Sequence, residues 1–196
     1  MKKIITYAHE LIQEVTQADD IVIDATCGNG YDTLFLSELV PSGKVYAFDV
    51  QSKAIETTQM RLVEKNISHV KMIYDSHANI KHHLLENEKI KSAIFNLGYL
   101  PHGDKNIITQ ADSTLKAIQQ IMAVLEVRGR IVLVIYSGHA GGESEKHAVT
   151  HFAENLPQEN FEVLKYQFIN QKNNPPFIIA IEKRKETDTN ASPLSR

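Results

Sequence analysis

Short runs rich in Val, Ile and Phe alternate with segments of helical periodicity along almost the whole chain. This alternation is typical of a mostly parallel β-sheet with helices on both faces. Polar or glycine residues bound each apolar run, as expected for buried strands. The runs predict five parallel strands at about 21–25, 44–49, 70–74, 92–96 and 130–136.

The segments between these strands carry apolar residues at helical spacing. They predict core-facing helices near 52–65 and 110–126, and another helix over 143–156. A further helix precedes Asp20, and we expect it to pack over the edge of the sheet. Its apolar face consists of Tyr7, Leu11, Ile12 and Val15.

Two more apolar runs, 161–168 and 177–182, predict strands that are joined by the Asn- and Pro-rich link 170–176. The link is too short for a helical crossover, so these two strands must be antiparallel neighbours. A seven-stranded, mostly parallel sheet with one antiparallel strand is the pattern of the Rossmann-like, class I methyltransferases. The chain is therefore predicted to have this α/β fold.

Length and composition fit one globular domain, which we place at 1–185 of the 196 residues, with a disordered tail at 186–196. No apolar run is long enough to span a membrane, and the N-terminus lacks the apolar core of a signal peptide. The single cysteine fits a reducing compartment, so we expect the cytoplasm. A net charge of −3 argues against a broad basic surface, although it allows a local RNA contact.

The clearest motif is the Gly-x-Gly turn at Gly28 and Gly30, which directly follows the first strand. The acidic residue Asp49 ends the second strand, 19 residues past Gly30. A turn and a carboxylate at this spacing predict a nucleoside pocket. Dinucleotide folds have a third glycine where this chain has Thr33, so we favour a cofactor without a pyrophosphate, S-adenosylmethionine.

Each residue around the turn then has an expected role. Asp49 accepts hydrogen bonds from the ribose hydroxyls, and Gln51 reaches the same sugar. Asn29 and Asp32 hold the methionine end; the less favoured alternative for Asp32 is an ordinary carboxylate in a first helical turn, stabilised by the helix dipole.

The other side chains of the turn are expected to act mainly on its structure. Asp24 organises the loop through backbone N–H groups. Cys27 belongs to the cofactor turn with Gly28 and Gly30, and it has no neighbouring base that would make it a nucleophile.

Ligands of open parallel sheets bind beyond the carboxyl ends of the strands. At the end of the third strand, one of Asp75, Ser76 or His77 should meet the adenosine, although Ser76 fits equally a helix N-cap. The fourth strand ends in Asn96, and the loop that follows contains Tyr99.

The residues after the fourth strand suit methyl transfer to an amine, which is neutral when it attacks and becomes cationic. The side-chain oxygen of Asn96 and the Leu97 carbonyl could hold the amine hydrogens, while Tyr99 stacks on a flat base. His139, which follows the fifth strand between glycines, could take the released proton. The alternative for this loop is a purely structural turn. The histidines, including the pair His82 and His83, lack metal-ligand spacing, so we expect no metal.

Several stretches together resemble the MnmM (YtqB) family, a group long labelled "putative rRNA methylase". They are DATCGNGYDT, YAFDVQ, Ser76-His77, FNLGYLP, the Gly-His-x-Gly-Gly segment around His139, and the closing 169–183. The resemblance implies S-adenosylmethionine-dependent N-methylation of 5-aminomethyl-2-thiouridine at wobble position 34 of tRNA. It also implies an anticodon stem-loop as partner. His102 stands where the family tends to have glycine, so no catalytic role is transferred to it.

Three alternatives remain at this point. The first is the same chemistry on another amine, such as a ribosomal RNA base. The second is a nicotinamide-dependent oxidoreductase, which Thr33 disfavours, and the third is a non-catalytic nucleoside-binding protein. A homodimer is compatible with the sequence, and Asn and Lys residues of the 170–176 link are expected at the catalytic edge, where they could touch RNA.

Overall fold

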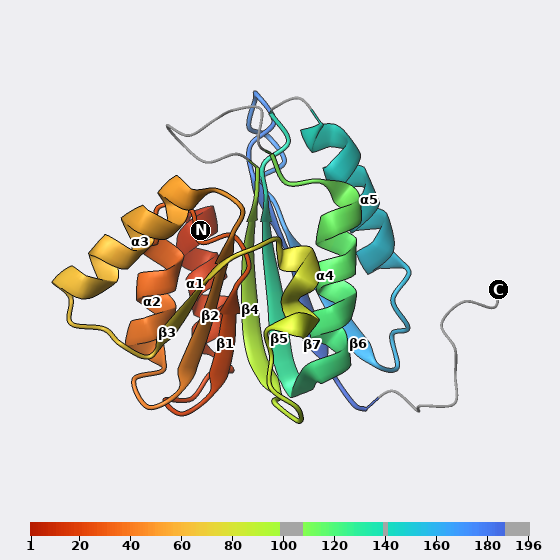
Figure 1. Cartoon of the computed structure of the whole chain (residues 1–196). Coiled ribbons are helices and arrows are strands. Elements are labelled where there is room, and N and C mark those ends of the chain that lie inside the picture. Colours follow the sequence, from red (N-terminus) through yellow and green to blue (C-terminus); the bar gives the residue numbers. More distant parts are fainter. Residues whose placement is uncertain (99–107, 139–140, 187–196) are drawn as a thin grey trace.

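The computed structural model describes residues 1–98, 108–138 and 141–186, and within them seven strands form one sheet (Figure 1). The strand order is β3-β2-β1-β4-β5-β7-β6. Strands β1 to β5 are parallel, and β7 is antiparallel to both of its neighbours. The predicted sheet, with one reversed strand, is confirmed. The strands are β1 Ile21–Asp24, β2 Lys44–Asp49, β3 Val70–Tyr74, β4 Ile90–Leu97, β5 Leu125–Ile135, β6 Phe161–Tyr166 and β7 Phe177–Lys183.

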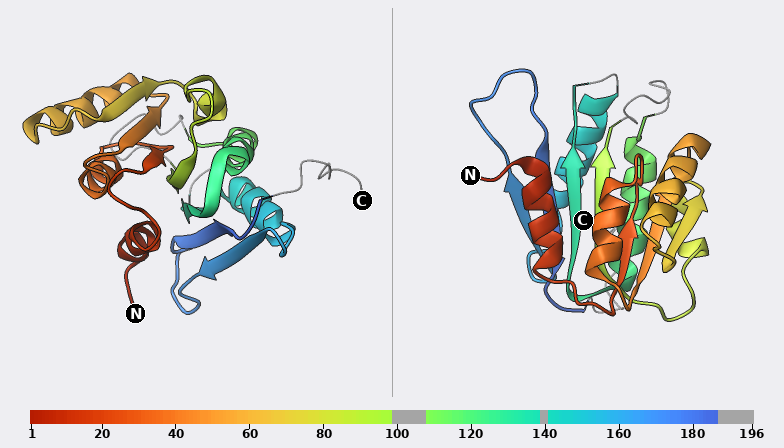
Figure 2. Two further views of the ribbon diagram at one scale, coloured as in Figure 1. Left: turned by 90° about the horizontal axis from the view of Figure 1, so that it is seen from below. Right: turned by 90° about the vertical axis from the view of Figure 1, so that its left-hand side faces the viewer.

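Helices cover both faces of this sheet. Figure 2 shows α1, α2 and α3 on one face and α4 and α5 on the other. A short 3-10 helix, η1, packs beside α4. The helices are α1 Ile4–Gln13, α2 Tyr31–Leu39, α3 Ser52–Glu64, η1 His77–His82, α4 Ala111–Val124 and α5 Gly142–Glu154.

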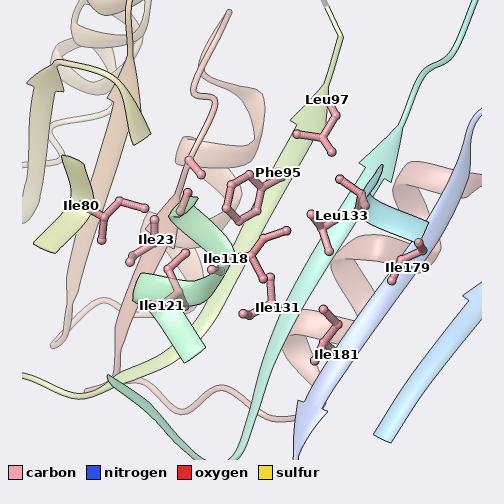
Figure 3. Close-up of a cluster of buried hydrophobic side chains, with 14 of the residues drawn as sticks. Ile23, Ile80, Phe95, Leu97, Ile118, Ile121, Ile131, Leu133, Ile179 and Ile181 are labelled. Carbon is pink, nitrogen blue, oxygen red and sulfur yellow. The ribbon is translucent and has the colours of Figure 1, made fainter. Parts of the chain in front are cut away.

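A buried apolar cluster fills each interface between sheet and helices. On one face, Ile118 and Ile121 of α4 pack against strand residues such as Phe95 and Leu133 (Figure 3). On the other face, α1 and α2 pack against alternate residues of the same strands, such as Val132 of β5. Because successive side chains of a strand point to opposite faces, a central strand that is covered twice must be apolar throughout. This requirement explains the unbroken apolar runs.

The prediction that the N-terminal helix covers the sheet edge is wrong. Helix α1 lies over the central strand β5 and also touches β4 and β7. Arg130 of β5 ties it there, because its guanidinium donates to the Leu11 carbonyl at 2.6 Å and to Glu14 at 2.9 Å. The same guanidinium group donates to Glu182 of β7 at 2.6 Å. The amphipathic pattern identified the buried face of the helix but carried no information on which strands it covers.

The fifth strand also begins earlier than predicted, at Leu125 immediately after α4. The regular alternation of side chains between the two faces of the sheet is interrupted in this part of β5. Arg128 has a φ of 64°, and the register against β4 shifts between Ile90 and Ser92. A polar, irregular first half concealed this part of the strand.

The last two strands are antiparallel neighbours, as predicted. Strand β6 runs parallel to β5, because each is antiparallel to β7. The loop between β6 and β7 therefore lies at the carboxyl edge of the sheet, as expected (Figure 2). Residues 187–196, most of the predicted tail, lie outside the described residues.

Truncating a central core side chain should destabilise the fold strongly. Leu133 is fully buried in β5, so Leu133→Ala should lower the free energy of unfolding by about 2–5 kcal/mol. Met60 is 60% exposed on α3, and Met60→Ala should change it by no more than about 0.5 kcal/mol. Urea denaturation of both variants checks this. Equal losses would contradict the assignment of the core.

Candidate functional site

A cavity of about 530 Å³ opens at the carboxyl edge of the parallel strands. Its volume is in the range typical of small-molecule sites. It brings together ten of the residues predicted for the site, which lie near or follow the ends of β1, β2, β3 and β4: Cys27, Gly28, Asn29, Asp32, Asp49, Gln51, Asp75, Ser76, His77 and Asn96. Tyr99, His102 and His139 lie outside the described residues.

Asp49 is fastened to the glycine turn by two backbone hydrogen bonds. Its Oδ2 accepts from the Gly28 N–H and its Oδ1 from the Gln51 N–H, both at 2.9 Å. Burial raises the pKa of this carboxyl, while the backbone donors oppose that rise. A carboxylate can accept about four hydrogen bonds, so Asp49 keeps capacity for a vicinal diol.

The turn itself requires glycine at Gly30, which does not line the cavity. Its φ is 80°, and a Cβ there would lie 2.7 Å from Oγ1 of Thr58. The same hydroxyl donates to the Gly28 carbonyl at 3.2 Å. Gly30 therefore allows α3 to pack closely against the turn. Gly30 was predicted among the cofactor residues, and in this position it would act on the cofactor through the shape of the turn.

Asp24 organises the turn from below, as expected. It is fully buried, and its carboxylate accepts from Oγ1 of Thr33 at 2.6 Å and from the Thr26 N–H at 3.2 Å. Burial, followed by the nearby charge of Asp32, raises the pKa of Asp24 to about 8.

Cys27 is buried, with its sulfur 4.0 Å from Oδ2 of Asp49. Burial, together with the carboxylates of Asp24 and Asp49, raises the pKa of this thiol far above its ordinary value. Since the thiolate is the reactive form, this environment supports the structural role over a nucleophilic one.

Asp32, in the first turn of α2, connects two other elements at the wall of the cavity. Its Oδ1 lies 2.6 Å from Nε2 of His9 on α1, and its Oδ2 accepts from Nδ2 of Asn96 on β4. An ionised carboxylate can only accept, so the nitrogen end of the Asn96 amide must face Asp32. The amide oxygen is then the end left for a ligand.

The residues after β3 combine capping and cavity-lining roles. Oγ of Ser76 accepts from the Ala78 N–H at 3.2 Å and so caps η1, and the residue also lines the cavity. His77 lies against the Ala25 carbonyl through Nδ1 at 3.0 Å, and burial lowers its pKa, so the ring is neutral. Within the described residues, its Nε2 has no hydrogen-bond partner.

The Leu97 carbonyl is engaged within the sheet. The Leu97 carbonyl was predicted to help hold the amine, but Leu97 does not line the cavity and its carbonyl accepts from the Tyr136 N–H at 3.0 Å. The β4 strand continues one residue beyond Asn96, so the carbonyl belongs to the ladder with β5.

Sequence reasoning missed several residues of the cavity wall. Tyr136 follows the last residue of β5, and the strand-end rule could have identified it. Ile5 and Thr109 come from α1 and from the segment before α4, which no local signal marks. Thr109 is held by Glu145 of α5, whose carboxylate also accepts from Thr114.

No helix within 1–98, 108–138 and 141–186 combines the length and apolar content that a membrane crossing requires. In the same ranges, no three His, Cys, Asp or Glu side chains are grouped so that they could hold a metal ion.

The strand order, the reversed β7 and an acid at the end of β2 beside a glycine turn define the fold of S-adenosylmethionine-dependent methyltransferases. Within this class, the chain belongs to the family described as "Putative rRNA methylase", whose model matches residues 45–182.

Relatives of known sequence and structure cover nearly the whole chain. The chloroplastic tRNA (mnm(5)s(2)U34)-methyltransferase of Arabidopsis thaliana is 38% identical over 192 residues, which are 93% of this chain and 70% of that protein. A "putative methyltransferase" of Streptococcus mutans, solved in complex with SAH, is 45% identical with a TM-score of 0.87, covering 93% of this chain and 99% of that one. A "putative rRNA-methylase" of Clostridium thermocellum is 40% identical with a TM-score of 0.90, covering 93% and 98%.

The buried carboxyl of Asp24 should make stability depend on pH. Its pKa is raised in the folded state, so its contribution is full below the unfolded pKa near 4 and is lost as pH rises towards about 8. Relative to Asp24→Asn, the wild type should lose up to about 1.4 kcal/mol per pH unit across this window. Urea unfolding of both proteins at several pH values measures the difference, and a constant difference would contradict the assignment.

Proposed function

We propose that this chain transfers the methyl group of S-adenosylmethionine to the amine of 5-aminomethyl-2-thiouridine at wobble position 34 of tRNA. The product is 5-methylaminomethyl-2-thiouridine. The substrate is an anticodon stem-loop, and the enzyme acts in the cytoplasm. Assembly as a homodimer stays a prediction from the sequence.

The observation that carries this proposal is the alignment of Asp49 and Asn96 on either side of β1. Asp24 of β1 pairs with Ala47 and with Ile94, and Asp49 and Asn96 stand two residues further along their strands. Both side chains therefore share a row and a face of the sheet, about 10 Å apart across the intervening strand. A ribose held at Asp49 would extend its sulfonium arm along this row towards Asn96.

The orientation of the Asn96 amide suits an amine as methyl acceptor. Its Nδ2 is committed to Asp32, so the carbonyl oxygen meets the acceptor. An oxygen there accepts an N–H from the amine and stabilises the positive charge that develops as the methyl group arrives. In the same proposal, Tyr99 stacks on the flat base and His139 accepts the released proton.

The remaining cavity residues are proposed to bind the cofactor. Gln51 and the Gly28 turn, with Cys27 behind it, surround the ribose. Ser76 and His77 meet the adenosine, and Asn29 and Asp32 lie near the methionine end. Asp32 has lone pairs left after its two contacts, so it can also receive the cofactor ammonium.

The relatives favour tRNA as the substrate. The Arabidopsis thaliana relative, which aligns along 93% of this chain, carries a name that specifies a modification at U34 of tRNA. A second candidate, a ribosomal RNA base, is supported by the family description and by ribosomal RNA small subunit methyltransferase H of Burkholderia vietnamiensis. That enzyme is 34% identical over 87 residues only, which are 26% of its own length.

The direct test supplies isotopically labelled S-adenosylmethionine, with tRNA carrying 5-aminomethyl-2-thiouridine in one reaction and ribosomal RNA in another. Mass spectrometry of the digested nucleosides locates the label. We expect label in 5-methylaminomethyl-2-thiouridine alone. Label confined to ribosomal RNA would support the second candidate and overturn the first.

Removal of the Asp49 carboxylate should abolish tight cofactor binding. Loss of two charge-assisted hydrogen bonds to a diol costs at least about 3 kcal/mol, or roughly 100-fold in Kd. Calorimetry with S-adenosylhomocysteine compares Asp49→Ala with Asp19→Ala, an exposed acid that does not line the cavity. Wild-type affinity in Asp49→Ala would show that the ribose binds elsewhere.

Removal of the Asn96 amide should separate turnover from cofactor binding. Asn96→Ala should lower kcat roughly 100-fold, because the developing charge loses its acceptor, while the Kd of S-adenosylhomocysteine changes little. Asn155→Ala, at the exposed end of α5, serves as control. An unchanged kcat in Asn96→Ala would remove this residue from the reaction.

A further inference from the structure

Helix α1 places one histidine, His9, against Asp32, which is a residue of the cavity wall. Its Nε2 lies 2.6 Å from Oδ1 of Asp32, and the side chains are 24% and 10% exposed. The imidazole ring also stacks on Phe35, with centroids 3.9 Å apart and planes 3° from parallel. Both contacts are to α2, so the ring is held in position and in orientation.

The contact with Asp32 continues to Asn96. Oδ1 of Asp32 contacts Nε2 of His9, and Oδ2 accepts a hydrogen bond from Nδ2 of Asn96. One carboxylate therefore bridges α1 and β4. Each oxygen of this carboxylate thus has one nitrogen neighbour, from α1 at Oδ1 and from β4 at Oδ2. A carboxylate oxygen accepts hydrogen bonds, so His9 contacts Oδ1 as the donor, in the tautomer that carries its proton on Nε2.

We infer that His9 is a positioning residue for methyl transfer, which it supports by locking Asp32 so that the Asn96 amide presents its oxygen to the acceptor amine. This inference rests on the proposed function of Asn96. With Oδ1 unpaired, the Asp32 carboxylate can rotate about its side-chain bonds and take the amide with it. Displacement of a reacting or orienting group by about 1 Å can cost roughly 100-fold in rate.

The position of α1 gives the inference its structural basis. The helix lies over β5 and is tied there by Arg130, and Ile5 of the same helix lines the cavity. The N-terminal segment is thus part of the site wall. A role limited to folding would not require a histidine whose donor points at an acid of the cavity.

The chain offers a matched control in His69. Its ring nitrogen lies 2.9 Å from the Ser37 carbonyl, so it too makes a hydrogen bond to α2, but its partner Ser37 does not line the cavity. His9→Phe keeps an aromatic ring against Phe35 and removes the donor to Asp32. His9→Gln restores an N–H donor without a ring, and His69→Phe removes the equivalent bond away from the site.

The experiment measures kcat and KM with tRNA carrying 5-aminomethyl-2-thiouridine, the Kd of S-adenosylhomocysteine, and the Tm of each variant. We expect His9→Phe to lower kcat about 10- to 100-fold, with KM and Kd within about 3-fold of wild type. His9→Gln should recover most of kcat, and His69→Phe should retain it. A kcat within 3-fold of wild type in folded His9→Phe would overturn the inference, as would a Kd loss matching the kcat loss.

A second measurement needs no substrate and separates this inference from the proposed function. In ¹⁵N spectra, the side-chain amide signals of Asn96, assigned from Asn96→Ala, report its hydrogen bond to Asp32. His9→Phe should shift them, and His69→Phe should leave them unchanged. Unshifted signals in His9→Phe would overturn the role of His9 even if the wild type methylates this tRNA. If the signals shift in His9→Phe but the wild type does not methylate this tRNA, the proposed substrate is rejected and the contact of His9 with Asp32 is retained.

Discussion

Parallel pairing of β1 with both β2 and β4 is the constraint on which the rest of the site depends. The paired register sets Asp24 level with Ala47 and Ile94, so the next residues of the same face, Asp49 at the end of β2 and Asn96 one residue before the end of β4, lie on one row. The hydroxyl of Thr26 accepts the Asn96 N–H at 2.7 Å and joins the turn to β4. The fold alone therefore places a carboxylate and an amide on opposite sides of one glycine turn.

The three acids around this turn, Asp24, Asp49 and Asp32, differ in burial and in hydrogen-bond partners. Asp24, fully buried with a raised pKa, supports the turn from within the fold. Asp49, held by two backbone N–H groups, keeps capacity for a ligand. Asp32 contacts both His9 and Asn96, so it links α1 to β4 at the wall of the cavity. In the proposed function, the cofactor ribose binds at Asp49 and the glycine turn, and the methyl acceptor binds at Asn96.

Much of this arrangement was predictable from the sequence, because strands with both faces buried and a Gly-x-Gly turn before an acid leave strong local patterns. The mostly parallel seven-stranded sheet, the reversed β7 and ten cavity residues were anticipated on that basis. The placement of α1 was not, since an amphipathic stripe identifies a buried face without its partner. His9 was missed for the same reason: it lies 23 residues before Asp32, and only tertiary packing of α1 brings the two together.

The central claim is that the cofactor lies along the row from Asp49 to Asn96. A crystal structure with S-adenosylhomocysteine tests it most directly. We expect the ribose hydroxyls to lie within hydrogen-bonding distance of the Asp49 carboxylate, and the sulfur to be directed towards the oxygen of the Asn96 amide. A ligand bound with its ribose away from Asp49, or with its sulfur turned from β4, would contradict the account.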